Sequence, residues 1–529
     1  MATHICDSAH AQATPPAPTV IAPPPPAPVV EPAPPPPPPV VVPPPAPIVV
    51  EPPPAVLLQP TPVPAPVVAA VPPPPEPNAT VDYNDGAFFL RAHHDNLVLT
   101  WGGRVQADVY AFAGDNVGHY HRGSNGTGLK PNLFFRRFIL ETGGIIRKHW
   151  FYWIGGNFTP AGLAADQSVN NTQLGVYDGF IGYMPKPWLK IYFGQYNEPF
   201  TMENVTSSRW TDLMERSLTV RSIATPYNKS DGLMVWGETP NKAFEYQLGV
   251  FGGDGQNRPN EDDRFDGTVR AIVRPFFNSS NAALKRAHFG GSMRDGRRDT
   301  HFVRYDAPNL NTHGGYTYFS SSYTNNGVDT RVVPARRQTA AGGELYLPFE
   351  RWDLKGEVIY INEERREVAS SDRSKSLRGG LFWGFGAYAQ LSVWVLGTPR
   401  VNGHPAGYYG MTKLPDGTTG AEAPYGLQLV ARGEVVRMNY DSNRRFGPVG
   451  GLDSVTQNID VNLFQFAVNY WATKHIRLTA QYNWYGFRGT PFNDKGGQGD
   501  NQAVAPGVRT GAAGANALHE ISFRAGLAF

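Results

Sequence analysis

The feature that most constrains the fold is a long series of short segments in which apolar and polar side chains alternate. In "HIRLTAQYNWY", Ile476 and Leu478 share one side while Arg477 and Thr479 share the other. Clusters of Gly, Asn, Asp and Pro separate the segments, and no stretch approaches 18 uninterrupted apolar residues. This pattern, which begins near Leu97, predicts an all-β chain.

We predict sixteen strands between this point and the C-terminus. Their expected ranges are 97–112, 133–146, 149–159, 173–184, 188–197, 230–238, 242–252, 265–277, 284–294, 339–348, 351–363, 379–397, 425–441, 457–471, 475–488 and 517–529.

The lengths of the links between these segments depend on their order. After even-numbered strands the links are mostly tight, such as "RK" at 147 and "ATK" at 472, whereas after odd-numbered strands they are long and polar. The link after the twelfth strand, at about 398–424, is a long exception. Short turns at one end and long loops at the other indicate an antiparallel transmembrane barrel, with turns in the periplasm and loops outside the cell.

A closed barrel also explains the alternation, because only a helix or a closed barrel satisfies its backbone hydrogen bonds in hydrocarbon. The apolar sides then face lipid and the polar sides line a lumen that sixteen strands leave wide enough for water. In the fourteenth strand the apolar positions change register between Leu463 and Phe464, which predicts a bulge. The last strand closes the barrel against the first and places Phe529 in the aromatic girdle at the periplasmic interface.

The N-terminal part differs in composition. Residues 1–13 contain Ala11-Gln12-Ala13, the form of a signal-peptidase site, and are interpreted as a possible signal-peptide remnant; a chance occurrence is the alternative. Residues 14–80 include 31 prolines between Pro15 and Pro77, so a polyproline II spacer is expected there. Two interpretations of this periplasmic segment stay open: a rod that reaches the cell wall, and an unstructured linker without a partner. The barrel domain is assigned to 81–529.

Composition and motifs argue against several other classes. The only cysteine is Cys6, and the net charge is +2, far from the strongly basic balance of nucleic-acid binders. The sequence lacks a G-x-S-x-G elbow, an H-E-x-x-H motif and a Walker loop, so we predict no enzymatic activity, no catalytic residues and no cofactor. The acidic "NEDDRFDG" at 260 matches no calcium-loop spacing and is interpreted as a solvated turn, and no metal site is predicted.

Several blocks carry a resemblance to a known family. "WLKIYFGQYNEPFTMENVTSSRWTDLMERSL" resembles the signature of the phosphate-selective porins of Gram-negative outer membranes, and "GGRVQADVY", "FFRRFILETGG", "AYAQLSVWVLGTPR" and "GLQLVARGEVVRMNY" resemble other blocks in the same order. The resemblance implies a homotrimer of sixteen-stranded barrels, a third long loop folded into the pore, and passive uptake of anions. It also implies that Phe529 belongs to the signal read during insertion.

Basic residues on the polar sides are the candidates for anion binding, because guanidinium groups replace the hydration of an anion with bidentate hydrogen bonds. The resemblance places a cationic pair on the second strand, here Arg136-Arg137; alternation favours Arg137 in the lumen and Arg136 toward lipid unless a bulge intervenes. Alternatively, the arginines pair with acidic neighbours such as Asp108, Glu141, Glu357 and Glu434. The predicted pore-lining set is Arg104, Arg137, Arg270, Arg274, Arg286, Arg294, Arg432, Arg477 and Arg524.

The expected constriction loop, 198–229, carries four basic and four acidic residues, so its charges balance. Its candidate residues are Arg209, Glu215, Arg216, Arg221 and Lys229. A balanced loop argues against strong phosphate selectivity and favours a diffusion channel with a mild preference for small anions. The competing hypothesis is a structural barrel that tethers the outer membrane to peptidoglycan through 14–80.

Overall fold

The computed structural model describes only part of the chain, all of it within one of two compact units. The other unit, residues 8–78, and the predictions made for 1–13 and for nearly all of 14–80 lie outside the described residues. The described ranges are 79–84, 87–92, 95–113, 131–159, 175–224, 229–281, 284–285, 287–299, 306–308, 310–315, 317–319, 321–325, 327–349, 351–374, 376–397, 399–401, 409–411, 425–442, 456–473, 475–490 and 517–529.

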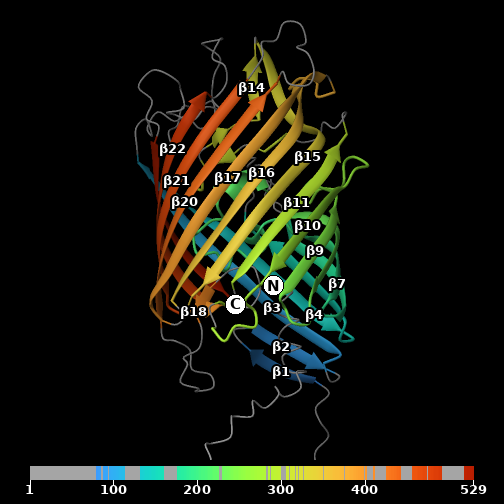
Figure 1. Cartoon of the computed structure of the whole chain (residues 1–529), viewed down its shortest axis with the longest axis vertical. Helices are drawn as coiled ribbons and strands as arrows, with labels where there is room; N and C mark the ends of the chain where they lie inside the picture. Colours follow the sequence, from blue (N-terminus) through green and yellow to red (C-terminus); the bar gives the residue numbers. More distant parts are fainter. Residues whose placement is uncertain are drawn as a thin grey trace, which may run out of the picture. The chain divides into compact units, whose positions relative to one another are not determined.

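Sixteen antiparallel strands form a closed barrel, as predicted (Figure 1). Each pairs with the next along the chain, and β23 pairs with β3, with Arg524 opposite Asp108, to close the ring. The strands are β3 (Leu97–Ala113), β4 (Asn132–Ile146), β5 (Trp150–Asn157), β6 (Gly175–Lys186), β7 (Leu189–Asn197), β8 (Lys229–Glu238), β9 (Phe244–Phe251), β10 (Asp266–Val273), β11 (His288–Arg298), β15 (Val328–Pro348), β16 (Trp352–Ala369), β17 (Ser376–Leu396), β20 (Gly426–Asp441), β21 (Thr456–Trp471), β22 (Ile476–Thr490) and β23 (Ala517–Ala528).

Smaller elements accompany the barrel. A hairpin of β1 (Ala79–Asn84) and β2 (Ala87–Ala92) continues the wall beside the first residues of β3. The others are β12 (Leu310–Asn311), β13 (Thr317–Phe319), β14 (Ser322–Asn325), β18 (Pro399–Val401), β19 (Tyr409–Met411), the helix α2 (Met202–Val205) and the π-helix η2 (Thr219–Ala224). Within the described ranges, no helix is long and apolar enough to cross a membrane.

The segregation of short and long links is largely as expected. Arg147 and Lys148 lie in one of the tight turns, 147–149, and both have positive φ, 50° and 64°. We call this end of the barrel the turn end and the opposite end the loop end. The link after β16 is an exception at the loop end: it spans only 370–375, because β15, β16 and β17 extend beyond their predicted limits. At the turn end, β10 stops at Val273 and β11 starts only at His288, so the predicted starts and stops there were wrong.

Bulges occur where the pattern did not place them. The register of β21 is continuous with both neighbours through Leu463 and Phe464, so the predicted bulge is wrong. Leu463 instead points into the barrel, where it packs in a cluster of apolar side chains, while Phe464 lies outside and is 48% exposed. One of several register shifts in the barrel lies in β4: Gln106 pairs with Arg137 and Ala107 with Phe135, which leaves Arg136 as the extra residue.

The outer and inner faces confirm the alternation. Ile476 and Leu478 are exposed outside, while Arg477 and Thr479 are buried inside. Exposed aromatic residues surround the turn end, as in the girdle of a membrane barrel: Trp101, Trp150, Trp188, Phe244, Phe276, Trp352, Tyr425, Tyr470 and Phe529. Phe529 closes the ladder through two backbone hydrogen bonds with Gly103, of 2.8 and 3.1 Å.

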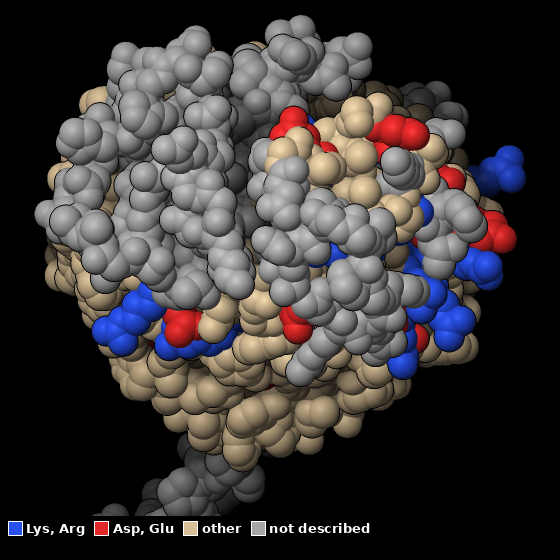
Figure 2. All heavy atoms as spheres, turned by 90° about the horizontal axis from the view of Figure 1, so that it is seen from above, with Lys and Arg blue, Asp and Glu red and all other residues tan. Residues whose placement is uncertain are grey.

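Protein fills much of the interior that was expected to be wet. Toward the loop end, inward apolar side chains such as Ile361, Val436 and Val461 form a cluster with residues of η2 and of the 306–319 region. Gly386 on β17 permits the close approach of η2, since a Cβ there would lie 2.7 Å from Thr219. In the view from the loop end, basic and acidic side chains lie next to each other at the visible rim (Figure 2).

Candidate functional site: the constriction inside the barrel

The link between β7 and β8 folds into the barrel, as expected for a constriction loop. Its described part, residues 198–224, contains α2 and η2, and the side chains of Phe200, Leu213 and Leu218 are completely buried. Two sections of the barrel wall contact this loop on different sides, and each holds it by a different chemistry.

On one side, carboxylates of the wall bind backbone N–H groups of the loop. The Glu357 carboxylate on β16 accepts hydrogen bonds from the backbone N–H of Met202 (2.5 Å) and Glu203 (3.1 Å), and from the Tyr388 hydroxyl (2.7 Å). On β20, Glu434 accepts from the backbone N–H of Thr219. We call Glu357 and Glu434 the carboxylate wall.

Ion pairs with acidic loop residues reinforce this side. Arg432 on β20 binds Glu203, and Lys355 on β16 lies 2.5 Å from the Asp212 carboxylate. Asp212 also accepts hydrogen bonds from Gln390 (2.7 Å) and Gln428 (2.9 Å). The contacts leave little freedom to this part of the loop.

On the other side, one loop carboxylate binds three arginines. Glu215 lies 2.9 Å from Arg136, 3.1 Å from Arg137 and 2.7 Å from Arg524. Burial alone raises the pKa of the Glu215 carboxyl, but the attraction of these three guanidinium groups outweighs it and holds the pKa well below its usual range. Because of the bulge in β4, Arg136 and Arg137 both point inward. The bulge is the exception that the sequence prediction allowed, and Arg136 does not face lipid.

Two further wall arginines complete this side. Arg104 donates to the Ser207 hydroxyl (2.9 Å) and pairs with Glu141 (3.4 Å), which also binds Arg209 of the loop at 3.3 Å. Arg477 donates to the backbone carbonyl of Thr211 (2.6 Å). We define the arginine wall as Arg104, Arg136, Arg137, Arg477 and Arg524, on β3, β4, β22 and β23.

The remaining pore-lining candidates are buried or paired away from the loop's centre. Arg270 makes a bidentate pair with Glu344 (2.7 and 2.9 Å), and Arg274 pairs with Glu245 at 3.1 Å just beyond β10. Arg294 lies 3.7 Å from both Glu198 and Glu363. Arg286 lies outside the described residues. For Arg270, Arg274 and Arg294 the geometry favours the interpretation as lumen ion pairs.

The other loop candidates have structural contacts. Arg216 donates to the backbone carbonyls of Glu203 (2.8 Å), Asn204 (3.1 Å) and Thr206 (2.8 Å), so it folds the loop on itself. Arg221 lies in η2. Lys229 is not a loop residue: it begins β8 and binds Asp178 of β6 at 2.5 Å.

The net charge of the loop is zero, but that of the constriction is not, because strand residues contribute most of the charge at the constriction. The arginine wall and Arg209 stand against the carboxylates of Asp108, Glu141 and Glu215, a local excess of positive charge. Alternation alone did not place Arg136 in the constriction, because its orientation depends on a bulge. Sequence reasoning missed the anchoring role of Glu357, which depends on contact with a loop 155 positions away.

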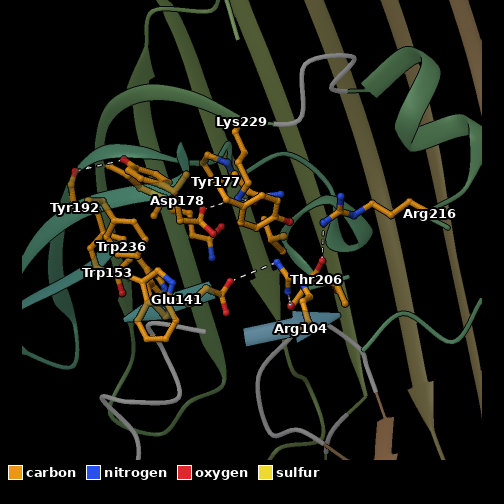
Figure 3. A pocket seen from close by; sticks show the side chains of 18 residues that line it. Arg104, Glu141, Trp153, Tyr177, Asp178, Tyr192, Thr206, Arg216, Lys229 and Trp236 are labelled. Carbon is orange, nitrogen blue, oxygen red and sulfur yellow. Dashed lines mark hydrogen bonds and ion pairs between the residues drawn. The ribbon is translucent and has the colours of Figure 1, made fainter. Parts of the chain in front are cut away.

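Next to the arginine wall lies a cavity of about 150 Å³, between the loop and the wall from β3 to β9 (Figure 3). Arg104, Glu141, Tyr177, Asp178 and Lys229 line one part of it. Aromatic side chains, among them Trp153, Phe180, Tyr192 and Trp236, line the other.

A closed sixteen-stranded barrel with an aromatic girdle and an inward-folded loop defines an outer-membrane porin fold. Residues 100–300 match the family described as "Phosphate-selective porin O and P", so the resemblance predicted from the sequence is confirmed over this part of the chain, which includes the constriction loop. The chain is also similar to Porin O of Pseudomonas aeruginosa, with 30% identity over 116 residues, or 22% of this chain and 24% of that porin. It thus matches only about a quarter of the relative's length.

Solved structures with similar folds include three outer-membrane proteins. OmpT of Vibrio cholerae in its trimer form has a TM-score of 0.45 and 11% identity, covering 82% of this chain and 99% of that chain. The channel DcaP of Acinetobacter baumannii has a TM-score of 0.41 and 10% identity, covering 83% and 99%. An anion-selective porin from Comamonas acidovorans has a TM-score of 0.41 and 10% identity, covering 82% and 100%.

Proposed function

We propose that this protein is an outer-membrane porin through which small hydrophilic solutes and ions diffuse passively, with a mild preference for anions. The observation that carries the proposal is the excess of guanidinium groups on one side of a loop that narrows a closed barrel. Between low-dielectric walls such an excess attracts anions and repels cations. Because the carboxylates of Asp108, Glu141 and Glu215 offset part of this charge, the preference is weak rather than phosphate-specific.

The assembly and location belong to the same proposal. The trimer form of the Vibrio cholerae OmpT structure agrees with a homotrimer embedded in outer-membrane lipids. On this proposal, residues 14–80 serve as a periplasmic spacer that contacts peptidoglycan. No nucleic acid takes part, and neither a cofactor nor a catalytic residue is required.

Conductance across a planar bilayer tests the proposal. The purified full-length protein should give stepwise chloride currents, and in a salt gradient the zero-current potential should have the sign of moderate anion preference. Removal of residues 1–80 should leave the conductance unchanged while altering attachment to cell-wall sacculi. A non-conducting barrel that still binds sacculi would instead support the tether.

A further inference from the structure

The cavity beside the arginine wall has a size that suits a single aromatic ring. Its volume is about 150 Å³, and an engineered apolar cavity of about 150 Å³ in another protein binds benzene. The loop residues Thr206 and Ser207 line the cavity, so it adjoins the constriction loop. We call it the aromatic cavity.

One part of the aromatic cavity is a wall of rings that already stack on each other. Phe180 and Tyr192 are nearly parallel, with centroids 5.6 Å apart and an interplanar angle of 12°. Tyr192 and Trp236 meet edge to face at 5.7 Å. Such rings offer an incoming ring either stacked or edge-on contacts, and they have no comparable interaction with a small inorganic anion.

The opposite part is charged, and a single tyrosine joins two of its cations. The guanidinium of Arg104 lies 4.8 Å from the Tyr177 ring centroid, and the Lys229 ammonium lies 4.3 Å from it. Arg104 uses its two terminal nitrogens for Ser207 and Glu141, whereas its buried Nε has no hydrogen-bond partner among the described residues. The indole N–H of Trp153 is likewise buried and has no partner there. Both of these donors belong to side chains that line the cavity.

The sign of the charge decides which ligand suits these donors. Three cations, Arg104, Arg216 and Lys229, line the cavity with two carboxylates, Glu141 and Asp178. The lining therefore has one positive charge in excess, and the two buried groups without a partner on Arg104 and Trp153 are both donors. An anionic acceptor satisfies them, whereas an ammonium group does not.

From this arrangement we infer that the aromatic cavity binds single-ring aromatic monocarboxylates of the benzoate type as they pass through the channel. The ring packs against Phe180 and Tyr192, and the carboxylate accepts a hydrogen bond from Arg104. The inference rests on the proposed channel function and specifies a solute class for it.

Single-channel recording tests this with three added solutes: benzoate, cyclohexanecarboxylate and benzylammonium. Benzoate and cyclohexanecarboxylate have the same charge and nearly the same size, so only the flat ring distinguishes them. Benzoate should reduce the chloride current at a concentration about 2- to 10-fold lower than cyclohexanecarboxylate, the range expected for an aromatic pair. Benzylammonium should be the weakest blocker.

Matched variants separate the ring from the charge. Phe180→Leu should remove the advantage of benzoate over cyclohexanecarboxylate, whereas Phe382→Leu, which removes an inner-wall ring outside the cavity lining, should keep it. Arg104→Gln should weaken the block by both carboxylates, and Arg104→Lys should restore part of it. Equal block by both carboxylates in the unmodified protein, or stronger block by benzylammonium, would overturn the inference.

A barrel that carries no chloride current would refute the channel function but would still leave the cavity testable. In that case, equilibrium dialysis of labelled benzoate against the same folded protein measures whether the cavity binds benzoate. Saturable binding that Phe180→Leu weakens and Phe382→Leu does not would support the aromatic cavity, and its absence would end the inference.

Discussion

The arginine wall and the carboxylate wall hold the same loop, but they do so with opposite charge. On the carboxylate wall, Glu357 and Glu434 accept hydrogen bonds from backbone N–H groups of the loop, so both carboxylates stabilise the loop conformation. On the arginine wall, three guanidinium groups share the single carboxylate of Glu215. The first side is an anchor, whereas the second has positive charge beyond what anchoring needs.

This difference separates the strength of loop attachment from the ion preference of the channel, two properties that the balanced charge of the loop does not reveal. The strength of loop attachment depends on both walls, since a buried charge that loses its partner is strongly unfavourable on either side. Ion preference depends mainly on the arginine wall, because the carboxylates of Asp108, Glu141 and Glu215 compensate only part of its charge. Substitutions on the two walls should therefore differ in kind as well as in size.

The largest effect is expected from Glu215→Gln. Without the carboxylate, Arg136, Arg137 and Arg524 remain buried together, and removing one member of such a network typically costs about 3–5 kcal/mol. The loop should detach from the arginine wall, so single-channel currents should become larger and noisier. Hydrogen exchange of residues 210–217 measures the detachment directly. If neither the current noise nor the exchange changes, Glu215 does not hold the loop.

Acidification should release a second inward segment, residues 310–315, over a defined pH range. His313 contacts the backbone carbonyl of Arg216 (2.9 Å) and the Tyr485 hydroxyl (3.0 Å). Burial, with a contribution from Arg221, lowers the pKa of His313 from 6.5 to about 3. The released segment therefore takes up a proton near pH 6.5, whereas the attached one does so only near pH 3. Attachment is strongest above pH 6.5 and weakens as the pH falls toward 3.

At pH 4.5 this shift corresponds to a loss of about 2–3 kcal/mol relative to neutral pH. Deuterium labelling of the backbone N–H groups of residues 310–315, corrected for the intrinsic pH dependence of exchange, should report the release between pH 7.5 and 4.5. In a His313→Gln background the same labelling should show a much smaller pH response. An unchanged response would assign the release to other groups.

A smaller effect is expected from Glu357→Gln on the carboxylate wall. Glutamine keeps one acceptor but loses the charge, so the hydrogen bonds from Met202 and Glu203 weaken by about 1–3 kcal/mol in total. Exchange of the N–H groups near α2 should accelerate, while ion preference should change little. A large shift of the zero-current potential in this variant would contradict the division of roles between the walls.

The sequence was sufficient to predict the barrel and its strand number, because alternation and link length reflect two rigid physical constraints. It was less informative about the interior. Ile361, Val436 and Val461 occupy inward positions that the alternation pattern assigns to polar side chains. They are apolar because they pack against loop residues rather than water. The orientation of Arg136 follows from one extra residue in β4, which no local pattern signals. The role of Glu357 depends on a contact between segments far apart in the chain.

The smallest expected effect, on ion preference, sharpens the comparison most. Arg137→Glu changes the local charge by two units on the arginine wall, and Lys355→Glu makes the same change beside the carboxylate wall. Because surface fields of several kT act in narrow clefts, Arg137→Glu should reduce the anion-to-cation permeability ratio by a factor of about 2 to 5. Arg136→Glu should shift the ratio in the same direction, since the bulge in β4 turns both side chains toward Glu215.

Lys355→Glu, by contrast, should mainly weaken the contact with Asp212 and affect loop attachment before selectivity. Zero-current potentials in a salt gradient, measured together with hydrogen exchange of 198–224, distinguish these outcomes. Equal shifts of the potential in Arg137→Glu and Lys355→Glu would mean that ions pass both walls alike. The arginine excess would then no longer explain anion preference. If Arg136→Glu left the potential unchanged while Arg137→Glu shifted it, Arg136 would hold the loop through Glu215 without contributing to ion preference.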